Sequence, residues 1–293
     1  MQERMLVGLI GANIQKSLSP ALFEDACVAR GILGHYHLMD MDQLSGRSLA
    51  DLLHAARVVG FKGVNITYPC KEAVIPLLDG LSPEARQLGA VNTVAIGTDG
   101  RTTGYNTDRI GFRRAFEQQL GAELVAGKAA MLVGAGGAGR AAAFALFDLG
   151  LRTLRVNDKD VEQARALVQT LAGVFGVERA QLEMDPSGAL SAVGGVVNAT
   201  PVGMLGIPGN PIPLDPIAAT HWVADVIYTP LETRLIKTAR SKGARVMGGA
   251  GMCVRQAAET FKLFTGLTAD VGRMQRTFAE AAAVREKTLE TAG

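Results

Sequence analysis

Gly134, Gly136 and Gly139 have the spacing G-x-G-x-x-G. The apolar run 130–133 predicts a buried strand before them, and the alanine-rich stretch after them predicts a helix. Glycines permit a tight turn and a close backbone approach, and the N-terminus of a helix attracts an anion. Together these features hold the pyrophosphate of a dinucleotide, so the sequence predicts a dinucleotide-binding unit.

Asp158 lies about 20 residues after Gly139, at the end of the next predicted strand, 153–157. A carboxylate at this place binds the adenine ribose hydroxyls and repels a 2′-phosphate, which favours NAD over NADP. The adjacent Lys159 could offset part of that repulsion, and Asp158 could also be only a polar strand end.

Four polar segments of the first 108 residues fall where the pattern predicts loops at strand ends. They are 17–20, 65–71, 89–94 and 104–108. Parallel sheets bind ligands at the carboxyl ends of their strands, so the hydroxyls, amides, lysine and aspartate of these segments could converge on a small molecule. Each also has an ordinary interpretation: serines as helix caps, Asn92 as a turn residue, Lys71 and Asp108 as solvated charges.

The elements that position these residues alternate between strand and helix. In the first 105 residues we predict strands at 5–10, 35–41, 61–67, 91–97 and 101–105, and helices at 20–30 (with Ser19 as N-cap), 48–60, 69–78 and 82–88. This alternation implies a mostly parallel sheet with an antiparallel edge. Further strands are predicted at 130–133, 153–157, 182–183, 195–198, 222–226 and 245–247, with helices at 107–120, 161–172, 253–265 and 269–290.

The fold class is therefore α/β with two domains. Residues 1–107 and 250–293 are expected to form a mostly parallel α/β substrate-binding domain. Residues 108–249 are expected to form a Rossmann-like NAD-binding domain. The last two helices are expected to pack back on the first domain.

Composition limits the remaining classes of function. The 293 residues carry a net charge of +2 with interleaved charges, which argues against nucleic acid as a partner. No signal-peptide core and no membrane-spanning run is present, so we expect no membrane association. Cys27, Cys70 and Cys253 are far apart, which favours reduced thiols in a cytoplasmic protein. His35 and His37 are interpreted as exposed strand residues, and no metal is expected.

Taken together, the motifs resemble the shikimate/quinate dehydrogenases. The matching strings are Ser-Leu-Ser-Pro at 17–20, Asn-x-Thr-x-Pro-x-Lys at 65–71, Gly-Ala-Val-Asn-Thr at 89–93, Gly-x-Asn-Thr-Asp at 104–108, Asn-Ala-Thr-Pro-Val-Gly-Met at 198–204, Asp-Val-Ile-Tyr-Thr-Pro at 225–230 and Gly-Ala-Gly-Met at 249–252 with Gln256. The resemblance covers nearly the whole chain, and it implies an enzyme that interconverts shikimate and 3-dehydroshikimate by hydride transfer.

The resemblance also implies roles for individual residues. Lys71 and Asp108 correspond to the catalytic pair. Substrate-binding residues would be Ser17, Ser19, Thr67, Asn92, Asp108, Tyr228 and Gln256. Cofactor-binding residues would be Gly134, Ala135, Gly136, Gly137, Ala138, Gly139, Asn157, Asp158, Asn198, Thr200, Val226, Gly249 and Met252.

Two features bear on the branch of the family. NADP-using members have Asn-Arg-Thr after the second strand of the nucleotide domain, whereas here Asp158 follows Asn157, which resembles the NAD-using branch. Some quinate-active members have threonine where Ser19 stands, so shikimate is the favoured substrate. Quinate or an amino analogue of shikimate remains an alternative, as does a non-catalytic ligand sensor of the same fold. We expect a monomer or a homodimer.

Overall fold

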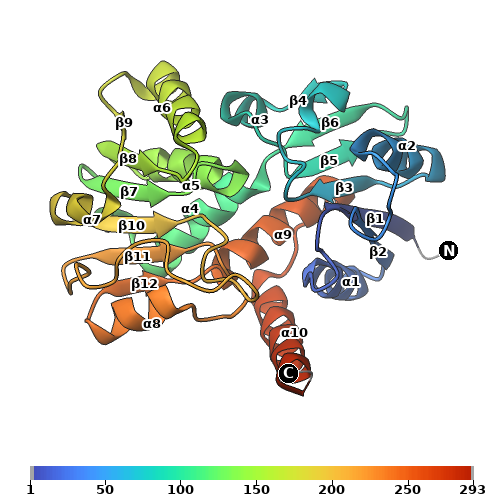
Figure 1. Cartoon of the computed structure of the whole chain (residues 1–293). Coiled ribbons are helices and arrows are strands. Elements are labelled where there is room, and N and C mark those ends of the chain that lie inside the picture. The colour runs from blue at the N-terminus through green and yellow to red at the C-terminus, as the bar shows by residue number, and fades with distance from the viewer. Residues whose placement is uncertain (1–2, 292–293) are drawn as a thin grey trace. The chain divides into compact units, whose positions relative to one another are not determined.

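The structure is a computed structural model that describes the backbone of residues 3–291 and the side chains of residues 3–285 (Figure 1). It divides into two units. Unit 1 consists of Met1–Thr107 and Gln256–Gly293, and unit 2 of Asp108–Arg255. The second boundary lies six residues beyond the predicted one, inside helix α9 (Ala250–Thr265).

Unit 1 contains a six-stranded sheet in the order β2-β1-β3-β5-β6-β4. The strands are β1 (Arg4–Gly11), β2 (Leu33–Asp40), β3 (Gly63–Ile66), β4 (Gly80–Leu81), β5 (Thr93–Ile96) and β6 (Thr102–Tyr105). Its helices include α1 (Ser19–Ala29), α2 (Leu49–Val59), α3 (Pro83–Leu88) and α10 (Val271–Thr291). The predicted α/β class and the hairpin formed by β5 and β6 are confirmed.

We had predicted that the antiparallel strand lies at the edge of the sheet, and this prediction was wrong. β5 lies inside the sheet and pairs antiparallel with both β3 and β6, whereas β4 pairs parallel with β6 and forms the edge. The reason is local. The chain returns from β3 through α3 and enters the sheet beside β3, and the tight turn at Gly100 (φ +77°) then reverses it into β6.

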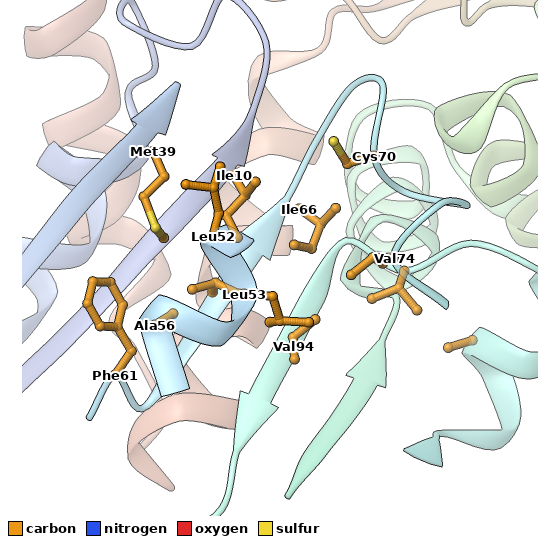
Figure 2. Close-up of a cluster of buried hydrophobic side chains, with 13 residues drawn as sticks. Ile10, Met39, Leu52, Leu53, Ala56, Phe61, Ile66, Cys70, Val74 and Val94 are labelled. Carbon is orange, nitrogen blue, oxygen red and sulfur yellow. The ribbon is translucent and has the colours of Figure 1, made fainter. Parts of the chain in front are cut away.

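The core of unit 1 lies between this sheet and α2 (Figure 2). Ile10 and Ile66 come from neighbouring parallel strands, and Leu52 and Leu53 come from α2; all four are buried. Helix α2 begins with a capping box between Ser48 and Asp51, so both its start and its apolar face are fixed by the sequence.

Two local predictions in unit 1 were wrong. Residues 69–78 do not form an α-helix; they form turns and a short 3₁₀-helix, Ile75–Leu77, because Pro76 lacks the N–H donor that a helix interior needs. Ser19 is the first helical residue of α1 rather than its cap, and Leu18 occupies the cap position. The Ser17 hydroxyl instead accepts a hydrogen bond from the Ser19 N–H at 3.2 Å.

Unit 2 contains a second six-stranded sheet, in the order β12-β11-β10-β7-β8-β9, with every pair parallel. The strands are β7 (Ala129–Val133), β8 (Thr153–Asn157), β9 (Ala180–Leu182), β10 (Gly195–Asn198), β11 (Trp222–Asp225) and β12 (Arg245–Met247). Helices α4 (Thr107–Gln119), α5 (Gly137–Asp148), α6 (Val161–Phe175), α7 (Pro186–Ala189) and α8 (Arg234–Ser241) accompany them (Figure 1). This is the strand order of a doubly wound dinucleotide-binding fold, so the Rossmann-like prediction is confirmed.

The C-terminal helices make contacts with the first domain, as predicted. On α10, the Arg273 guanidinium binds the Asp25 carboxylate of α1 with donor–acceptor distances of 2.6 and 2.8 Å. On α9, the ring of Phe264 packs so closely on β3 that a Cβ at Gly63 would lie only 2.2 Å from it. Glycine in β3 therefore permits this packing. Among the described residues, no helix has the length and apolar character needed to cross a membrane.

Candidate functional site

The glycine loop of unit 2 connects β7 to α5 at the point where the strand order reverses. Gly134 has a φ of +101°, and a Cβ at Gly139 would be 1.9 Å from the Gly134 carbonyl oxygen. Both positions therefore require glycine for conformation or packing. At Gly136, by contrast, an added Cβ would meet no heavy atom within 4 Å.

Gly136 is also the N-cap of α5, and no side chain of the described residues caps that helix. The first N–H groups of α5 thus have no side-chain cap and lie beside a backbone without a Cβ, which is the arrangement that accepts a phosphate group. Gly137 and Ala138 begin the helix, and both are partly buried. The geometry fits the pyrophosphate of a dinucleotide.

Asp158 lies just beyond β8 and is bonded to the glycine loop. Its Oδ2 accepts a hydrogen bond from the Ala135 N–H at 2.7 Å, and its Oδ1 accepts one from the Asp160 N–H at 2.9 Å. A carboxylate offers about four acceptor positions, so these contacts leave capacity for ribose hydroxyls. Lys159 is exposed.

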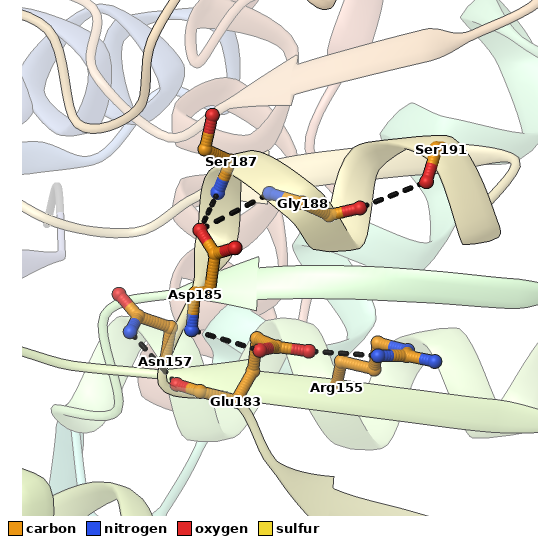
Figure 3. Close-up of polar contacts among 7 residues, drawn as sticks. All are labelled: Arg155, Asn157, Glu183, Asp185, Ser187, Gly188 and Ser191. Atoms are coloured by element: carbon orange, nitrogen blue, oxygen red, sulfur yellow. Dashed lines mark hydrogen bonds and ion pairs between the residues drawn. The ribbon is translucent and has the colours of Figure 1, made fainter.

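Asn157 ends β8 and ties it to β9. Its Nδ2 donates to the Glu183 carbonyl at 2.9 Å, and the Glu183 carboxylate pairs with Arg155 at 2.8 Å (Figure 3). Burial raises the pKa of Glu183, but hydrogen bonds from Arg155 and the Asp185 N–H outweigh it and leave the pKa below its usual value. These contacts fix the strand ends from which Asp158 projects.

The loop after β10 lies against the glycine loop. A Cβ at Gly134 would be 2.7 Å from the carbonyl carbon of Ala199, and the Ala199 N–H donates to the Val133 carbonyl at 2.7 Å. Asn198 is fully buried, and its Oδ1 accepts from the backbone N–H of Thr200 at 3.0 Å and from the Thr200 hydroxyl at 2.7 Å. Two of the predicted cofactor residues thus act on each other directly.

Asp225, at the end of β11, begins one of the matching strings, but the sequence analysis gave it no role. It is fully buried and accepts a hydrogen bond from Asn198 Nδ2 at 3.0 Å. Burial raises its pKa to about 6, and hydrogen bonds from Thr233, Ile227 and Asn198 limit the rise. The signal available in the sequence was an acidic residue inside the apolar run 222–227.

The remaining predicted cofactor residues of unit 2 lie around the end of β11. The Gly249 N–H donates to the Ile227 carbonyl at 3.1 Å, and a Cβ at Gly249 would be 2.2 Å from the Val226 carbonyl oxygen. Met252 is buried on α9. Tyr228, predicted to contact substrate, follows β11 and is partly buried.

In unit 1, the loops after β1 and β3 meet, as expected for the ends of neighbouring parallel strands. The Ala12 N–H donates to the Tyr68 carbonyl at 2.9 Å, and a Cβ at Gly11 would be 2.3 Å from the Thr67 methyl group. Thr67 is partly buried there, and its N–H donates to the Ile10 carbonyl at 3.0 Å.

Asp40 holds the loop that carries Ser17 and Ser19. Its carboxylate accepts from the N–H groups of Asn13 and Ile14 at 3.1 and 3.2 Å, and from the Gln15 side chain at 3.0 Å. Burial raises its pKa, but these hydrogen bonds together with that from the Asp42 N–H leave it below its usual value. Asp40 was also missed, because its only signal was a charge at the end of an apolar strand.

Lys71 and Asp108 are positioned by different parts of the backbone. The Lys71 carbonyl accepts a hydrogen bond from the Val91 N–H at 2.8 Å, which joins the loop after β3 to the segment before β5. Asp108 is 6% exposed in the first turn of α4. The preceding Thr107 is 3% exposed and is the last residue of the first segment of unit 1.

A buried polar network surrounds Asn92 and Thr107. Asn92 Nδ2 donates to the Thr107 hydroxyl at 2.9 Å, and Asn92 Oδ1 accepts from the Thr107 N–H at 2.8 Å. The Thr107 hydroxyl also lies 3.2 Å from that of Thr260 and 3.4 Å from Gln256 Oε1. Predicted residues Asn92 and Gln256 are therefore brought together in unit 1.

The network extends to Asn65 and Thr93, which belong to the matching strings, and to Tyr36, which the sequence analysis did not name. Asn65 Nδ2 donates to the Thr93 hydroxyl at 3.0 Å, and its Oδ1 accepts from the Tyr36 hydroxyl at 2.9 Å. Among the residues that the structure describes, no group of three or more histidine, cysteine, aspartate or glutamate side chains is placed to hold a metal ion. His35 and His37 are exposed, as predicted.

Comparison with known proteins agrees with this geometry. The family model for the shikimate dehydrogenase substrate binding domain matches residues 9–94. A quinate/shikimate dehydrogenase (NAD(+)) of Corynebacterium efficiens is 46% identical over 281 residues, covering 94% of this chain and 98% of that protein. A shikimate dehydrogenase (NADP(+)) of Pseudarthrobacter chlorophenolicus is 43% identical over 289 residues, with 97% of both chains covered.

The fold agrees as well. The structure of quinate dehydrogenase from Corynebacterium glutamicum in complex with NAD has a TM-score of 0.88 to this chain at 43% identity, and the match covers 95% of this chain and 100% of that one. The matched region covers nearly all of this chain. The chain therefore belongs to the shikimate/quinate dehydrogenase family of α/β oxidoreductases.

Proposed function

We propose that this chain is an NAD-dependent shikimate dehydrogenase that interconverts shikimate and 3-dehydroshikimate, with unit 2 binding NAD and unit 1 binding the substrate. The observation that carries the proposal is the glycine loop with Asp158 bonded to it, in a chain nearly half identical to an NAD(+)-dependent relative. Unit 2 would hold NAD⁺, which would supply the hydride acceptor for the ring carbon that bears the oxidised hydroxyl.

The residues of unit 2 would hold the cofactor by complementary chemistry. The N–H groups at the start of α5 would donate to the pyrophosphate, and the open position at Gly136 would let it approach. Asp158 would accept hydrogen bonds from the adenine ribose, with Asn157 beside it. Gly134, Ala135, Gly137, Ala138 and Gly139 would form the cradle, and Asn198, Thr200, Val226, Gly249 and Met252 would line the rest.

The substrate would be held through its carboxylate and hydroxyl groups. Ser17 and Ser19 would donate hydrogen bonds to the carboxylate, with Tyr228 nearby. Asn92 uses one N–H of its amide on Thr107, so the second N–H is available for a ring hydroxyl. Thr67, Asp108 and Gln256 would bind the other ring hydroxyls.

Lys71 and Asp108 would carry the proton chemistry. Oxidation breaks a C–H bond, whose electron pair leaves as hydride, and an O–H bond, whose proton Lys71 accepts at Nζ. In the reverse direction the Lys71 ammonium returns the proton to the carbonyl oxygen. The Asp108 carboxylate would hold Nζ at the reacting oxygen, because a lysine side chain is otherwise free to rotate.

A second candidate activity is quinate oxidation by the same site. It is favoured by relatives whose names include quinate, at 43 to 46% identity. Oxidation of an amino analogue of shikimate is a further alternative, and a non-catalytic sensor would keep the fold without the turnover.

The test is a spectrophotometric assay of the purified protein with shikimate and quinate, each with NAD and with NADP. We expect reduced cofactor to form fastest with shikimate and NAD. A faster reaction with quinate would favour the second candidate. Binding of shikimate without any cofactor reduction would contradict the enzyme assignment and support a sensor.

We further propose a cytoplasmic enzyme that is a monomer or a homodimer. The relatives described above are named as dehydrogenases of the small molecules quinate and shikimate. Light scattering during size-exclusion chromatography would distinguish the two oligomeric states, and a larger assembly would contradict both.

A further inference from the structure

Asp225 is an acid buried without a charged partner. It ends β11 with 0% of its surface exposed, and among the described residues no lysine, arginine or histidine pairs with it. Burying a lone carboxylate is costly, because the interior replaces its water shell incompletely. A residue needed only to fill this space would be apolar, so the charge calls for another explanation.

All three groups that contact the Asp225 carboxylate are hydrogen-bond donors. Oδ1 accepts from Asn198 Nδ2 and from the Ile227 N–H, each at 3.0 Å, and Oδ2 accepts from the Thr233 hydroxyl at 2.7 Å. These groups belong to the end of β10, the loop after β11 and the N-cap of α8. One carboxylate thus joins three segments of unit 2.

The contact with Asn198 fixes which way that amide points. An ionised carboxylate is only an acceptor, so it selects the NH₂ side of the Asn198 amide. The amide oxygen then faces Thr200, where it accepts from both the backbone N–H and the hydroxyl. If the amide rotated by half a turn, NH₂ would face these two donors, and both would lose their acceptor.

Thr200 in turn orders the loop after β10. Its hydroxyl oxygen accepts from the Val202 N–H at 3.1 Å, and Asn198 Nδ2 also donates to the Val202 carbonyl at 3.3 Å. This is the loop whose Ala199 contacts Gly134. A chain of hydrogen bonds therefore connects Asp225 through Asn198 and Thr200 to the loop that contacts the glycine loop.

We propose that Asp225 is a positioning residue for cofactor binding, which fixes the amide of Asn198 and thereby holds the Ala199–Val202 loop in the conformation that receives NAD. This inference rests on the proposed function of unit 2. Asp225 itself lies away from solvent and acts through Asn198.

The test compares three variants by calorimetric titration with NAD⁺. Asp225→Leu has the same number of side-chain heavy atoms and no acceptor, and we expect it to weaken NAD⁺ binding at least tenfold. Asp225→Asn can accept from Asn198 and Ile227 through its oxygen while its NH₂ faces Thr233. We therefore expect it to stay within about threefold of the wild type.

Thr233→Val is the matched control. It removes the partner of Oδ2 and the cap of α8, which costs stability, but it leaves the contact between Asp225 and Asn198 intact. We expect its affinity for NAD⁺ to stay within about threefold of the wild type. Equal weakening in Thr233→Val and Asp225→Leu would show a loss of general stability and overturn the proposal.

A second variant covers a failure of Asp225→Leu to fold. Asp225→Ala leaves room for water beside the N–H groups that donate to Asp225 in the wild type. Water does not fix the Asn198 amide, because it donates as well as accepts. The same tenfold loss is expected, and in a Thr200→Val background the Ala change should add less than threefold, because both act through one loop. Full additivity would contradict the route through Asn198.

The wild-type titrations separate the two proposals. If the wild-type protein does not bind NAD⁺, the proposed function fails and this inference fails with it. If the wild type binds NAD⁺ and Asp225→Leu binds it equally well, only the role of Asp225 is overturned. Shikimate titrations of each variant serve as a further control, since we expect no change greater than about twofold.

Discussion

The carbonyl oxygen of Gly134 lies 1.9 Å from the place where a Cβ of residue 139 would stand. Because residue 139 is glycine and has no Cβ, the glycine loop can close against the first turn of α5. Gly136, two residues along, has open space on the corresponding side. The glycines of this motif therefore have different roles: Gly139 is required by packing inside the protein, whereas Gly136 is not. Substitutions at the two positions should distinguish these roles.

We expect Gly136→Ala to fold normally but to weaken NAD⁺ binding at least tenfold, because the methyl group would occupy the space for the pyrophosphate. Its φ of −70° suits alanine, so the free energy of unfolding should be unchanged or slightly higher. Gly139→Ala should lose both stability and NAD⁺ binding. Urea denaturation measures the free energy of unfolding, and calorimetry measures NAD⁺ affinity. Normal NAD⁺ affinity in Gly136→Ala would contradict the proposal that the pyrophosphate binds beside Gly136.

Lys71→Ala should reduce kcat by at least ~10²-fold, the lower range for loss of a positioned acid or base. Asp108→Asn should also reduce kcat, because we propose that Asp108 orients Lys71. Lys62→Ala, at an exposed lysine of the same unit, is the control and should keep wild-type turnover. Near-normal steady-state turnover of Lys71→Ala would show that another group moves the proton.

The double change of Ser17 and Ser19 to alanine should weaken shikimate binding and leave NAD⁺ binding unchanged. Part of any stability loss comes from the hydrogen bond between the Ser17 hydroxyl and the Ser19 N–H, which is worth about 1 kcal/mol. Ser48→Ala removes the cap of α2 and serves as the control for that loss. Equal weakening of both ligands in binding titrations would indicate a folding defect.

Asp158 should give the wild-type enzyme at least a ~10-fold preference for NAD over NADP in kcat/KM, since repulsion of a 2′-phosphate costs more than ~1.4 kcal/mol. Asp158→Ala should narrow the preference. It should also lower NAD affinity, because the Ala135 N–H loses its acceptor. Steady-state kinetics with both cofactors test this, and a wild-type preference for NADP would be incompatible with the assigned role.

Asp225 should make stability depend on pH in the direction opposite to that of an ordinary salt-bridged acid. Its folded pKa, about 6, lies above the unfolded value, so its stabilising contribution is full below the unfolded pKa and is lost as pH rises through 6. Asp225→Asn does not titrate. Its free energy of unfolding relative to wild type should therefore rise between about pH 4 and pH 7, by up to about 3 kcal/mol. Urea denaturation across that range measures the difference; a flat difference would mean that Asp225 titrates normally.

Much of the fold could be predicted from the sequence, because apolar runs that stop at a polar residue define strand ends closely. The strands Thr153–Asn157, Gly195–Asn198 and Arg245–Met247 have the predicted bounds. Strand β4 was missed because two residues are too few to show a period. Helix α8 was missed although its strong amphipathic pattern was available in the sequence.

The candidate site was less predictable where it depends on long-range contacts. Its segments were recognisable because they combine polar groups with strand ends. The hydrogen bond between Asn65 and Thr260, by contrast, joins residues 195 positions apart, and neither residue type is unusual for its element. Likewise, Asp40 and Asp225 look like ordinary charges until folding encloses them, since burial is a property of the packed chain.

Unit 1 is assembled from both ends of the described chain, with the continuous segment of unit 2 between them. A ribosome synthesises the strands of the first sheet well before Thr260 and Arg273 exist. The hydroxyl that completes the Asn65 network and the guanidinium that binds Asp25 therefore arrive after all of unit 2 has been made. The sheet of unit 2 and the helices around it lie in one uninterrupted stretch. Although unit 2 is made after the first segment of unit 1, it is therefore the first unit whose sheet and surrounding helices are all present in the nascent chain.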